Sequence, residues 1–183
     1  NLSSSISANV FNMRARKFET TLSASLFNNN VPEEVFHNLI NTFKKKLPVW
    51  HRYFEIKRKA LKLKDMQYFD MWAPIAKKKV PVSYEKAVDY ISESLAPLGK
   101  EYVEIMRQGC LKDRWVDSTT NLGKMNGAFS YGSPSTHPFI MMSFTDDIGS
   151  MSTLAHELGH SMHSYLTWKN QAYAYSGYSL FVA

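Results

Sequence analysis

The amino-acid sequence predicts a mainly α-helical protein with a small antiparallel β ribbon beside one helix of distinctive chemistry. Apolar residues recur at spacings of three and four through most of residues 1–112, which is the period of an amphipathic helix. From residue 113 the chain becomes rich in Gly, Ser, Thr and Asn and contains two short apolar runs typical of strands. Residues 150–167 then return to a helical pattern. We therefore expect a helical part over 1–112 and a mixed part over 113–183.

The first strong helical pattern follows Pro32, which suits the first turn of a helix. Two glutamates come next and favour the positive end of the helix dipole. Apolar residues at helical spacing run from 35 to 47, and a similar stripe continues to Leu61. Pro48 lies between the two stripes and is expected to kink or split the helix, because proline removes a backbone hydrogen bond.

Two further helices are expected in the first part of the chain. One covers 83–95 with Ser83 as its N-cap, and the other runs through 102–111. Pro97 and Gly99 separate them. The Tyr, Phe and Met stripes of all these helices are expected to pack in a core rather than to hold a cofactor.

Two strands are expected in the mixed part, over 127–131 and 139–144. Both are short apolar runs with β-forming residues. The connection between them contains Gly132 and Pro134 and is short enough for a hairpin. These features predict the antiparallel ribbon.

Composition and charge exclude several classes of protein. The chain of 183 residues is 44% hydrophobic, with 8 Gly and 7 Pro, which is ordinary for a globular protein and not for a disordered or collagen-like one. The single cysteine, Cys110, excludes an internal disulfide framework and fits a reducing compartment. No apolar run approaches the 18 or so residues of a membrane span, and the N-terminal residues do not resemble a signal peptide. We expect no membrane partner.

The net charge of +6 is concentrated in the first part of the chain. Residues 1–112 hold 19 Lys/Arg against 11 Asp/Glu, whereas residues 113–183 hold 3 against 5. The basic runs, at 44–46, 52–64 and 77–79, could contact phosphate. Acidic and apolar residues lie among them, however, and no nucleic-acid recognition motif is present. We expect a solvated surface and no nucleic-acid partner.

The chemistry of the chain is concentrated in the sequence His-Glu-x-x-His at residues 156–160. Four residues advance a helix by about 400°, so His156 and His160 project from one face and can converge on one zinc ion. Glu157 lies about 100° round the helix, where it can take a proton from a water molecule that the metal activates. Gly159, inside the motif, is expected to allow close backbone packing.

The third metal ligand is not evident from the residues alone. No Asp or Glu follows His160 in this chain, and Leu166 stands where one related pattern has a third histidine. His163 lies on the face of the pair but one turn further along, which favours a core or supporting role. Upstream possibilities without supporting spacing are His137, Asp146 and Asp147. A helix whose histidines simply pack is the alternative interpretation.

Several segments resemble the thimet-oligopeptidase-like zinc metallopeptidases, and within them the oligoendopeptidase F group. The resemblance covers nearly all of this chain, which corresponds to about a third, the central part, of a family member. The segments that carry it are 19–48, 68–70, 123–129, 137–139, 156–164 and 175–183. Met125-Asn126 and Gly149-Ser150 depart from the family's usual residues, although Ser150 can still cap the metal helix.

This resemblance implies a zincin-like (gluzincin) fold and a cytoplasmic zinc endopeptidase that acts on internal bonds of short, unstructured peptides. It implies that the third ligand is a Glu directly after Ala183, and that the groups stabilising the oxyanion lie further downstream. We therefore expect the remainder of the same enzyme chain to be needed, and this chain alone to be a poor catalyst. Gly127, Ala128 and Phe129 would bind substrate, because an edge strand with little side-chain bulk can pair with an extended peptide.

Two alternatives to this function stay open. The chain could be a helical interaction module with incidental metal binding, and the related zinc peptidases include carboxypeptidases. An ordinary hairpin that begins with small residues is the alternative interpretation of positions 127–128.

Overall fold

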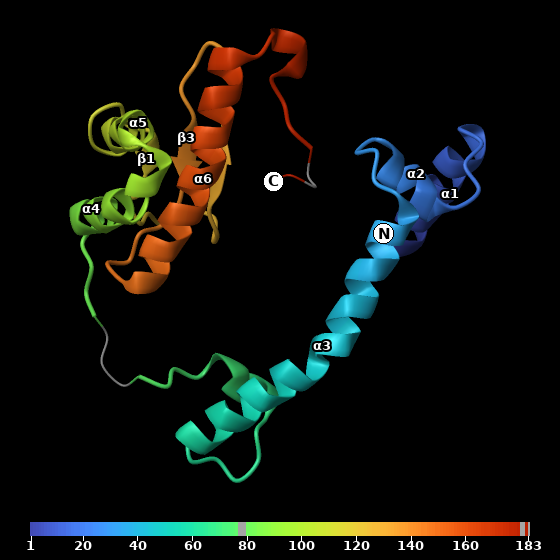
Figure 1. Cartoon of the computed structure of the whole chain (residues 1–183), viewed down its shortest axis with the longest axis horizontal. Coiled ribbons are helices and arrows are strands. Elements are labelled where there is room, and N and C mark those ends of the chain that lie inside the picture. The colour runs from blue at the N-terminus through green and yellow to red at the C-terminus, as the bar shows by residue number, and fades with distance from the viewer. Residues whose placement is uncertain (77–79, 180–181, 183) are drawn as a thin grey trace. The chain divides into compact units, whose positions relative to one another are not determined.

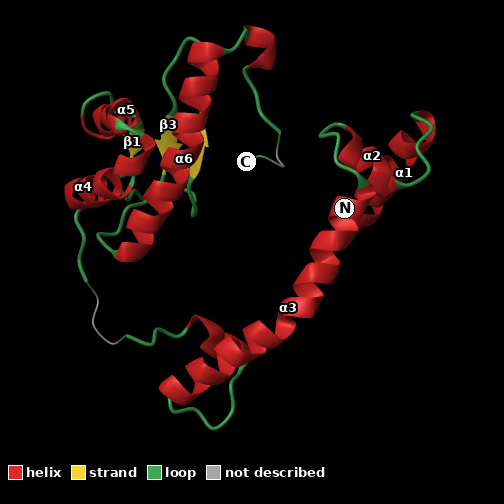
Figure 2. Cartoon of the chain, viewed as in Figure 1, coloured by secondary structure: helices red, strands yellow, loops and turns green. Residues whose placement is uncertain are grey.

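A computed structural model of the chain describes residues 1–76, 80–179 and 182. The chain forms two compact units, Asn1–Lys77 and Lys78–Ala183, and each is described by itself. Helices dominate both units, as Figures 1 and 2 show. The predicted mainly α fold with a small sheet is confirmed. The basic run at 77–79 lies outside the described residues.

The first unit is built around one long helix. Its elements are α1 (Leu2–Ala15), α2 (Thr21–Phe27), α3 (Glu33–Ala60) and the short 3-10 helix η1 (Tyr68–Trp72). Helix α3 continues through Pro48 without interruption and bends along its length (Figure 1). Of the two expected effects of Pro48, a kink or a split, the split does not occur. Near its end, Lys57 is buried and its Nζ donates a hydrogen bond to the carbonyl oxygen of Met71, 2.7 Å away.

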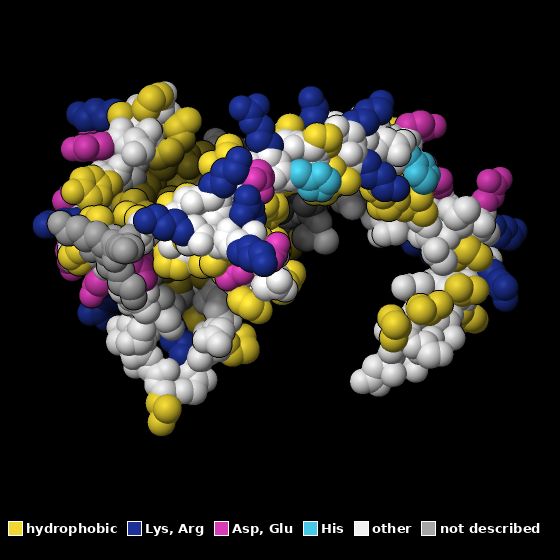
Figure 3. Space-filling model, turned by 90° about the horizontal axis from the view of Figure 1, so that it is seen from below, with side chains coloured by type: hydrophobic (Ala, Val, Ile, Leu, Met, Phe, Trp, Pro, Cys, Tyr) yellow, Lys and Arg dark blue, Asp and Glu magenta, His cyan; other side chains and the backbone are white. Residues whose placement is uncertain are grey.

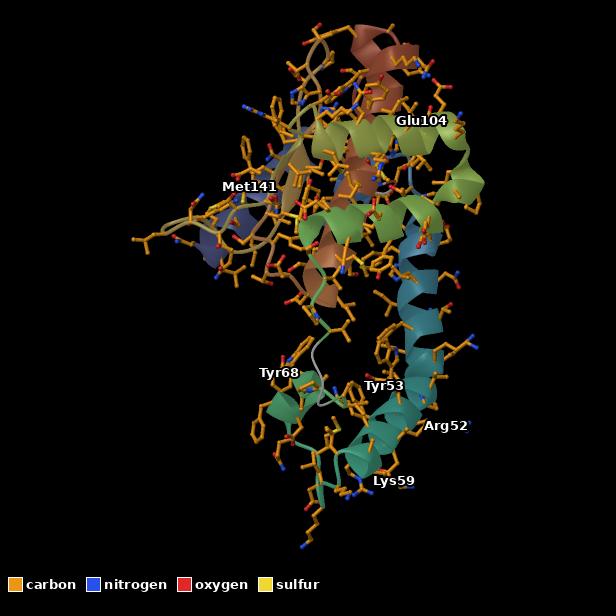
Figure 4. The ribbon with its side chains drawn as sticks, turned by 90° about the vertical axis from the view of Figure 1, so that its left-hand side faces the viewer. Arg52, Tyr53, Lys59, Tyr68, Glu104 and Met141 are labelled. Carbon is orange, nitrogen blue, oxygen red and sulfur yellow. The ribbon has the colours of Figure 1, made fainter. Side chains whose placement is uncertain are left out.

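The apolar stripe of α3 is exposed, which contradicts the expectation that it packs in a core. Within this unit the short helix α2 contacts α3, but the side chains of the stripe remain accessible. The exposed members are Val35, Phe36, Leu39, Ile40, Phe43, Val49, Trp50, Tyr53 and Ile56. Arg52 and Lys59 extend away from the helix (Figure 4). On the face drawn in Figure 3 the basic side chains are interspersed with apolar and acidic ones.

The second unit contains the helices α4 (Tyr84–Ser94), α5 (Lys100–Leu111) and α6 (Ile148–Asn170). The 3-10 helix η2 (Ala96–Leu98) separates α4 from α5, and η3 (Tyr173–Tyr175) follows α6. Ser83 caps α4, since its hydroxyl accepts the N–H of Lys86 at 3.4 Å. The helices predicted over 83–95, through 102–111 and over 150–167 are thus confirmed.

The sheet has three short strands in the order β1-β3-β2. They are β1 (Val116–Asp117), β2 (Phe129–Tyr131) and β3 (Phe139–Met141). Strands β2 and β3 form the predicted antiparallel ribbon, with Ser130 opposite Ile140, although both strands are shorter than expected. The parallel pairing of β1 with β3 was not predicted, because a two-residue strand leaves no periodic signal.

The buried core lies entirely in the second unit and joins α4, α5, the sheet and α6. Its apolar members are Val82, Ala87, Val88, Ile91, Met106, Cys110, Trp115, Ile140, Met142, Phe144, Leu154, Leu158 and Met162. The boundary expected at 112/113 marks a change of composition, whereas the compact units divide earlier because α4 and α5 pack against α6. In the described part of the chain, no helix is long and apolar enough to cross a membrane.

Candidate metal site

The helix that carries His-Glu-x-x-His begins with a side-chain cap. Asp147 is the N-cap of α6: its Oδ1 accepts the backbone N–H of Ser150 at 2.7 Å, and its Oδ2 accepts the hydroxyl of Thr145 at 3.0 Å. The hydrogen bond from the Ser150 N–H, followed by that from Thr145, lowers the pKa of Asp147. Ser150, which the sequence offered as the cap, instead accepts the N–H of Thr145 through its hydroxyl at 3.1 Å.

One face of α6 packs against the sheet. Leu154, Leu158 and Met162 are fully buried, and their spacing of four residues explains why this stretch forms a helix with one apolar face. Ser161 is also fully buried, and its Oγ lies 2.8 Å from Oγ of Ser130 on β2. This hydroxyl pair joins the helix to the strand, and it satisfies a polar group that would otherwise be costly to bury.

The two histidines of the motif face each other as the sequence predicts. Nε2 of His156 and Nε2 of His160 are 3.1 Å apart, and the rings are nearly perpendicular, at 83°. Placing an ion 2.0–2.1 Å from each nitrogen gives an angle of about 100° at the metal, near the tetrahedral value that zinc adopts. The separation of the two nitrogens therefore suits one zinc ion.

Glu157 lies on the buried side of the helix beside this pair, with 6% of the residue exposed. It shares that side with Leu154 and Ser161. A carboxylate at this position cannot chelate the ion comfortably together with both histidines, because it projects about 100° away from His156. Glu157 is thus adjacent in sequence to the first histidine and lies on the face of α6 that is buried.

In the part of the chain that the structure describes, no third ligand joins the pair. Among the described residues, no group of three His, Cys, Asp or Glu side chains is close enough to hold an ion. His163 stacks on Tyr178, with 3.9 Å between the ring centroids and 12° between the planes. His137 packs against Trp115 and Phe139. The supporting role expected for His163 thus has a specific partner, which the sequence did not reveal.

A small cavity of about 240 Å³ opens beside the histidine pair. Its lining residues are His156, Gly159, His160, His163 and Val182. The expectation that Gly159 permits close packing is wrong, because a Cβ built on it would meet nothing within 4 Å. The missing side chain instead leaves open space between the two turns that carry the histidines.

The expected substrate residues lie at an edge of the sheet. Phe129 begins β2, which is the outer strand in the order β1-β3-β2, so its other edge pairs with no strand in the described part of the molecule. Gly127 and Ala128 precede the strand, and Gly127 has φ +102°, a left-handed conformation that favours glycine. An edge of this kind can hydrogen-bond to an extended peptide.

A second cavity, of about 460 Å³, connects this strand to α6. It is lined by Gly127 and Ala128 on one side and by Gly149, Ser150 and Thr153 on the other. Thr153 lies three residues before His156, and therefore on nearly the same face of the helix. The residues that lead into β2 and the histidine pair thus lie along one side of α6.

Two contacts of this region could not be predicted from the sequence. They are the pairing of Ser130 with Ser161 and that of His163 with Tyr178, and no local pattern marks either one.

A His-Glu-x-x-His helix packed beside a sheet with an open edge strand is typical of metallopeptidases. Residues 2–183 match peptidase family M3, and the chain belongs to this family. The resemblance to the oligoendopeptidase F group is therefore confirmed.

Similar proteins cover nearly the whole chain. Oligopeptidase PepF of Bacillus subtilis (strain 168) is 44% identical over 183 residues, which are 100% of this chain and 27% of that protein. An oligoendopeptidase F homolog of Borreliella burgdorferi is 43% identical over 177 residues, which are 96% of this chain and 30% of that protein. The crystal structure of a proposed peptidase from Chlamydophila abortus superposes with a TM-score of 0.81 at 39% identity. The match covers 97% of this chain and 30% of that one. The chain spans less than a third of the length of these relatives.

Proposed function

We propose that this chain contributes the metal-binding histidines, the general base and part of the peptide-binding edge of a zinc-dependent oligoendopeptidase. The main observation in support is that Nε2 of His156 and Nε2 of His160 lie 3.1 Å apart on one helix, with Glu157 next to His156 in the sequence. Membership of peptidase family M3 supports the reaction class. The names of the relatives, oligopeptidase and oligoendopeptidase, support short peptides as substrates.

The residues of the chain have separate tasks in this reaction. His156 and His160 present the lone pairs of Nε2, which requires that each ring carry its proton on Nδ1. A bound zinc ion supplies positive charge that polarises the peptide carbonyl and lowers the pKa of water. Glu157 accepts a proton from the attacking water and passes it to the departing amine, so the products are a carboxylic acid and an amine. The edge of β2 holds the peptide extended.

The remainder of the protein is proposed to complete the site. Two nitrogen ligands are fewer than the three protein ligands of catalytic zinc sites, and the family resemblance implies a Glu directly after Ala183 as the third. We further propose that the protein works in the cytoplasm. The family resemblance implies that location, and the single cysteine fits a reducing compartment.

The test measures zinc binding and peptide cleavage separately in the intact protein. His156→Ala and His160→Ala should each abolish stoichiometric zinc binding. Glu157→Gln should keep zinc and lose about 10²–10⁴-fold in turnover, the usual contribution of a general base. His51→Ala is the matched control, because His51 is an exposed histidine on α3, and it should retain both properties.

Two outcomes would favour the alternatives. Zinc binding that survives both alanine variants would indicate a helical interaction module with incidental metal binding. Cleavage of internally quenched peptides that is lost when the C-terminus is amidated would indicate a carboxypeptidase, since an endopeptidase does not need the free carboxylate.

A further inference from the structure

Two hydroxyl groups meet where the helix of the histidine pair contacts the edge strand. Oγ of Ser161 on α6 lies 2.8 Å from Oγ of Ser130 on β2. Ser161 is fully buried and Ser130 is half-buried, so one hydroxyl donates to the other largely out of contact with solvent. Because a buried polar group is costly unless it is paired, this hydrogen bond holds the strand and the helix at one defined separation.

The helix partner of this hydrogen bond lies one turn from the proposed general base. Glu157 and Ser161 are four residues apart on α6, which brings them to the same face, about 6 Å apart along the axis. Both are buried there, with 6% and 0% of the residue exposed. His160 directly precedes Ser161. The hydroxyl of Ser161 thus ties β2 to the helical turn that carries the base and one of the two histidines.

The strand partner faces α6, whereas its neighbours in β2 face away from the helix. Residues alternate between the two faces of a strand, and Phe129 and Tyr131 are 46% and 76% exposed. Ser130 stands opposite Ile140 of β3, which is 1% exposed and therefore belongs to the same, helix-facing side of the sheet. A shift of β2 by one residue would exchange the two faces and break the hydroxyl pair. The hydrogen bond is thus compatible with one position of β2 along α6.

The residues that lead into β2 approach α6 on the other side of the base. Gly127 and Ala128 line the 460 Å³ cavity together with Thr153. Thr153 precedes Glu157 by one helical turn and Ser161 follows it by one turn, so all three lie on one face of α6. The edge segment therefore runs alongside the helix past the base. A peptide paired with the free edge of β2 would lie one strand spacing further out, about 4.7–4.9 Å, and its position along α6 is set by that of β2.

We propose that the hydrogen bond between Ser130 and Ser161 fixes the peptide-binding edge along α6 and so determines which peptide bond lies beside Glu157 and the histidine pair. Both serines are positioning residues, since Ser161 is fully buried and the side chain of Ser130 faces the helix. They act on the peptide through the backbone of β2. The inference rests on the proposed function and adds to it a structural basis for the choice of the bond that is cut.

Removing the hydrogen bond should slow cleavage and spread it over neighbouring bonds. A displacement of about 1 Å between reacting groups can cost about 10²-fold in rate, and a loosened strand should lose part of this factor. Ser161→Ala should therefore lower kcat about tenfold and raise the share of products cut one or two bonds away at least twofold. Zinc affinity should stay within about twofold of the wild type, because both histidines belong to α6 itself.

The experiment uses the intact protein and three measurements. Zinc affinity comes from competition with a chelator, kcat from an internally quenched peptide, and the cleaved bonds from mass spectrometry of a peptide with several susceptible bonds. Ser130→Thr and Ser130→Val have nearly the same shape and differ in the hydroxyl, so the Thr variant should turn over several times faster than the Val variant and cut with narrower selection. Ser130→Ala combined with Ser161→Ala should lose no more than either single variant, because each change already removes the same hydrogen bond. Ser152→Ala is the matched control, since Ser152 is an exposed serine of α6, and it should leave all three measurements within twofold.

The outcomes separate the inference from the function on which it rests. If Ser161→Ala turns over within twofold of the wild type, or cleaves more slowly at unchanged bonds, the positioning role is overturned while the zinc peptidase function stands. Losses that multiply in the double variant would overturn it as well. If circular dichroism shows that Ser161→Ala does not fold, the comparison of Ser130→Thr with Ser130→Val decides, and equal behaviour of these two overturns the role. A wild-type protein that binds no zinc or cleaves no peptide would overturn the proposed function, and the inference with it.

Discussion

Two glycines that both lie inside α-helices should respond in opposite directions to the same substitution. Gly109 lies in α5 and Gly159 in α6. A Cβ on Gly109 would lie 2.3, 2.5 and 2.7 Å from three atoms of the Trp115 indole, whereas a Cβ on Gly159 would meet nothing within 4 Å. The first substitution therefore overpacks the core, and the second only replaces a flexible residue by a better helix former.

The magnitudes follow from these distances. Gly→Ala in a helix interior gains about 1 kcal/mol in the free energy of unfolding. Overpacking a core costs about 1–3 kcal/mol, and Trp115 has little room to move because it is 3% exposed and packs on Tyr165 at 5.6 Å between centroids. The net loss for Gly109→Ala is therefore up to about 2 kcal/mol, whereas Gly159→Ala should gain about 1 kcal/mol.

Urea unfolding followed by circular dichroism measures both variants against the wild-type chain. A chelator is present throughout, so that metal bound to the folded state does not add to the measured stability. Equal stability of the two variants, or a Gly109→Ala chain more stable than the wild type, would refute the packing argument. Either result would mean that Trp115 moves away at little cost.

Two further predictions concern titratable groups in the second unit. Burial raises the pKa of the Cys110 thiol to about 12, so the folded chain should not react with a thiol reagent at pH 8, while the urea-unfolded chain should react fully. Asp147→Ala should cost about 1 kcal/mol by removing the cap of α6, whereas Asp147→Asn should keep most of the capping. Because the pKa of Asp147 is lowered on folding, its charge stabilises the chain above about pH 4, and this contribution is lost as the pH falls through the lower folded value. Urea titrations between pH 2.5 and 7 should show the wild type losing its advantage over Asp147→Asn at the acid end, and a pH-independent difference would contradict the assignment.

The helices and the histidine pair could be predicted because their signals are local. Apolar residues at helical spacing predicted α4, α5 and α6, since the period of a helix is written into neighbouring positions. The separation of four residues alone brings His156 and His160 to one face. The start of α6 was less certain, because Asp147 and Ser150 are both good capping residues. The structure selects Asp147, whose backbone is extended and whose side chain accepts the N–H of Ser150.

Other features depend on residues distant in the chain. The stripe of α3 has the same pattern as that of a buried helix, yet its side chains are exposed in the first unit. Exposure depends on which surfaces are available nearby, and periodicity does not report that. Strand β1 pairs with β3 across more than 20 residues of chain, and the two residues involved carry no pattern of their own.

The sequence by itself determined the chemistry of this protein: two imidazoles and one carboxylate on a single helix, with a spacing that suits one metal ion. Only the tertiary structure decided the surroundings of that helix. It placed β2 at the open edge of the sheet and left space for a side chain at Gly159 but none at Gly109. It also stacked the ring of His163 on that of Tyr178. The reason is physical. Helical spacing is a property of consecutive residues, whereas packing and stacking are set by side chains that folding brings together from separate segments.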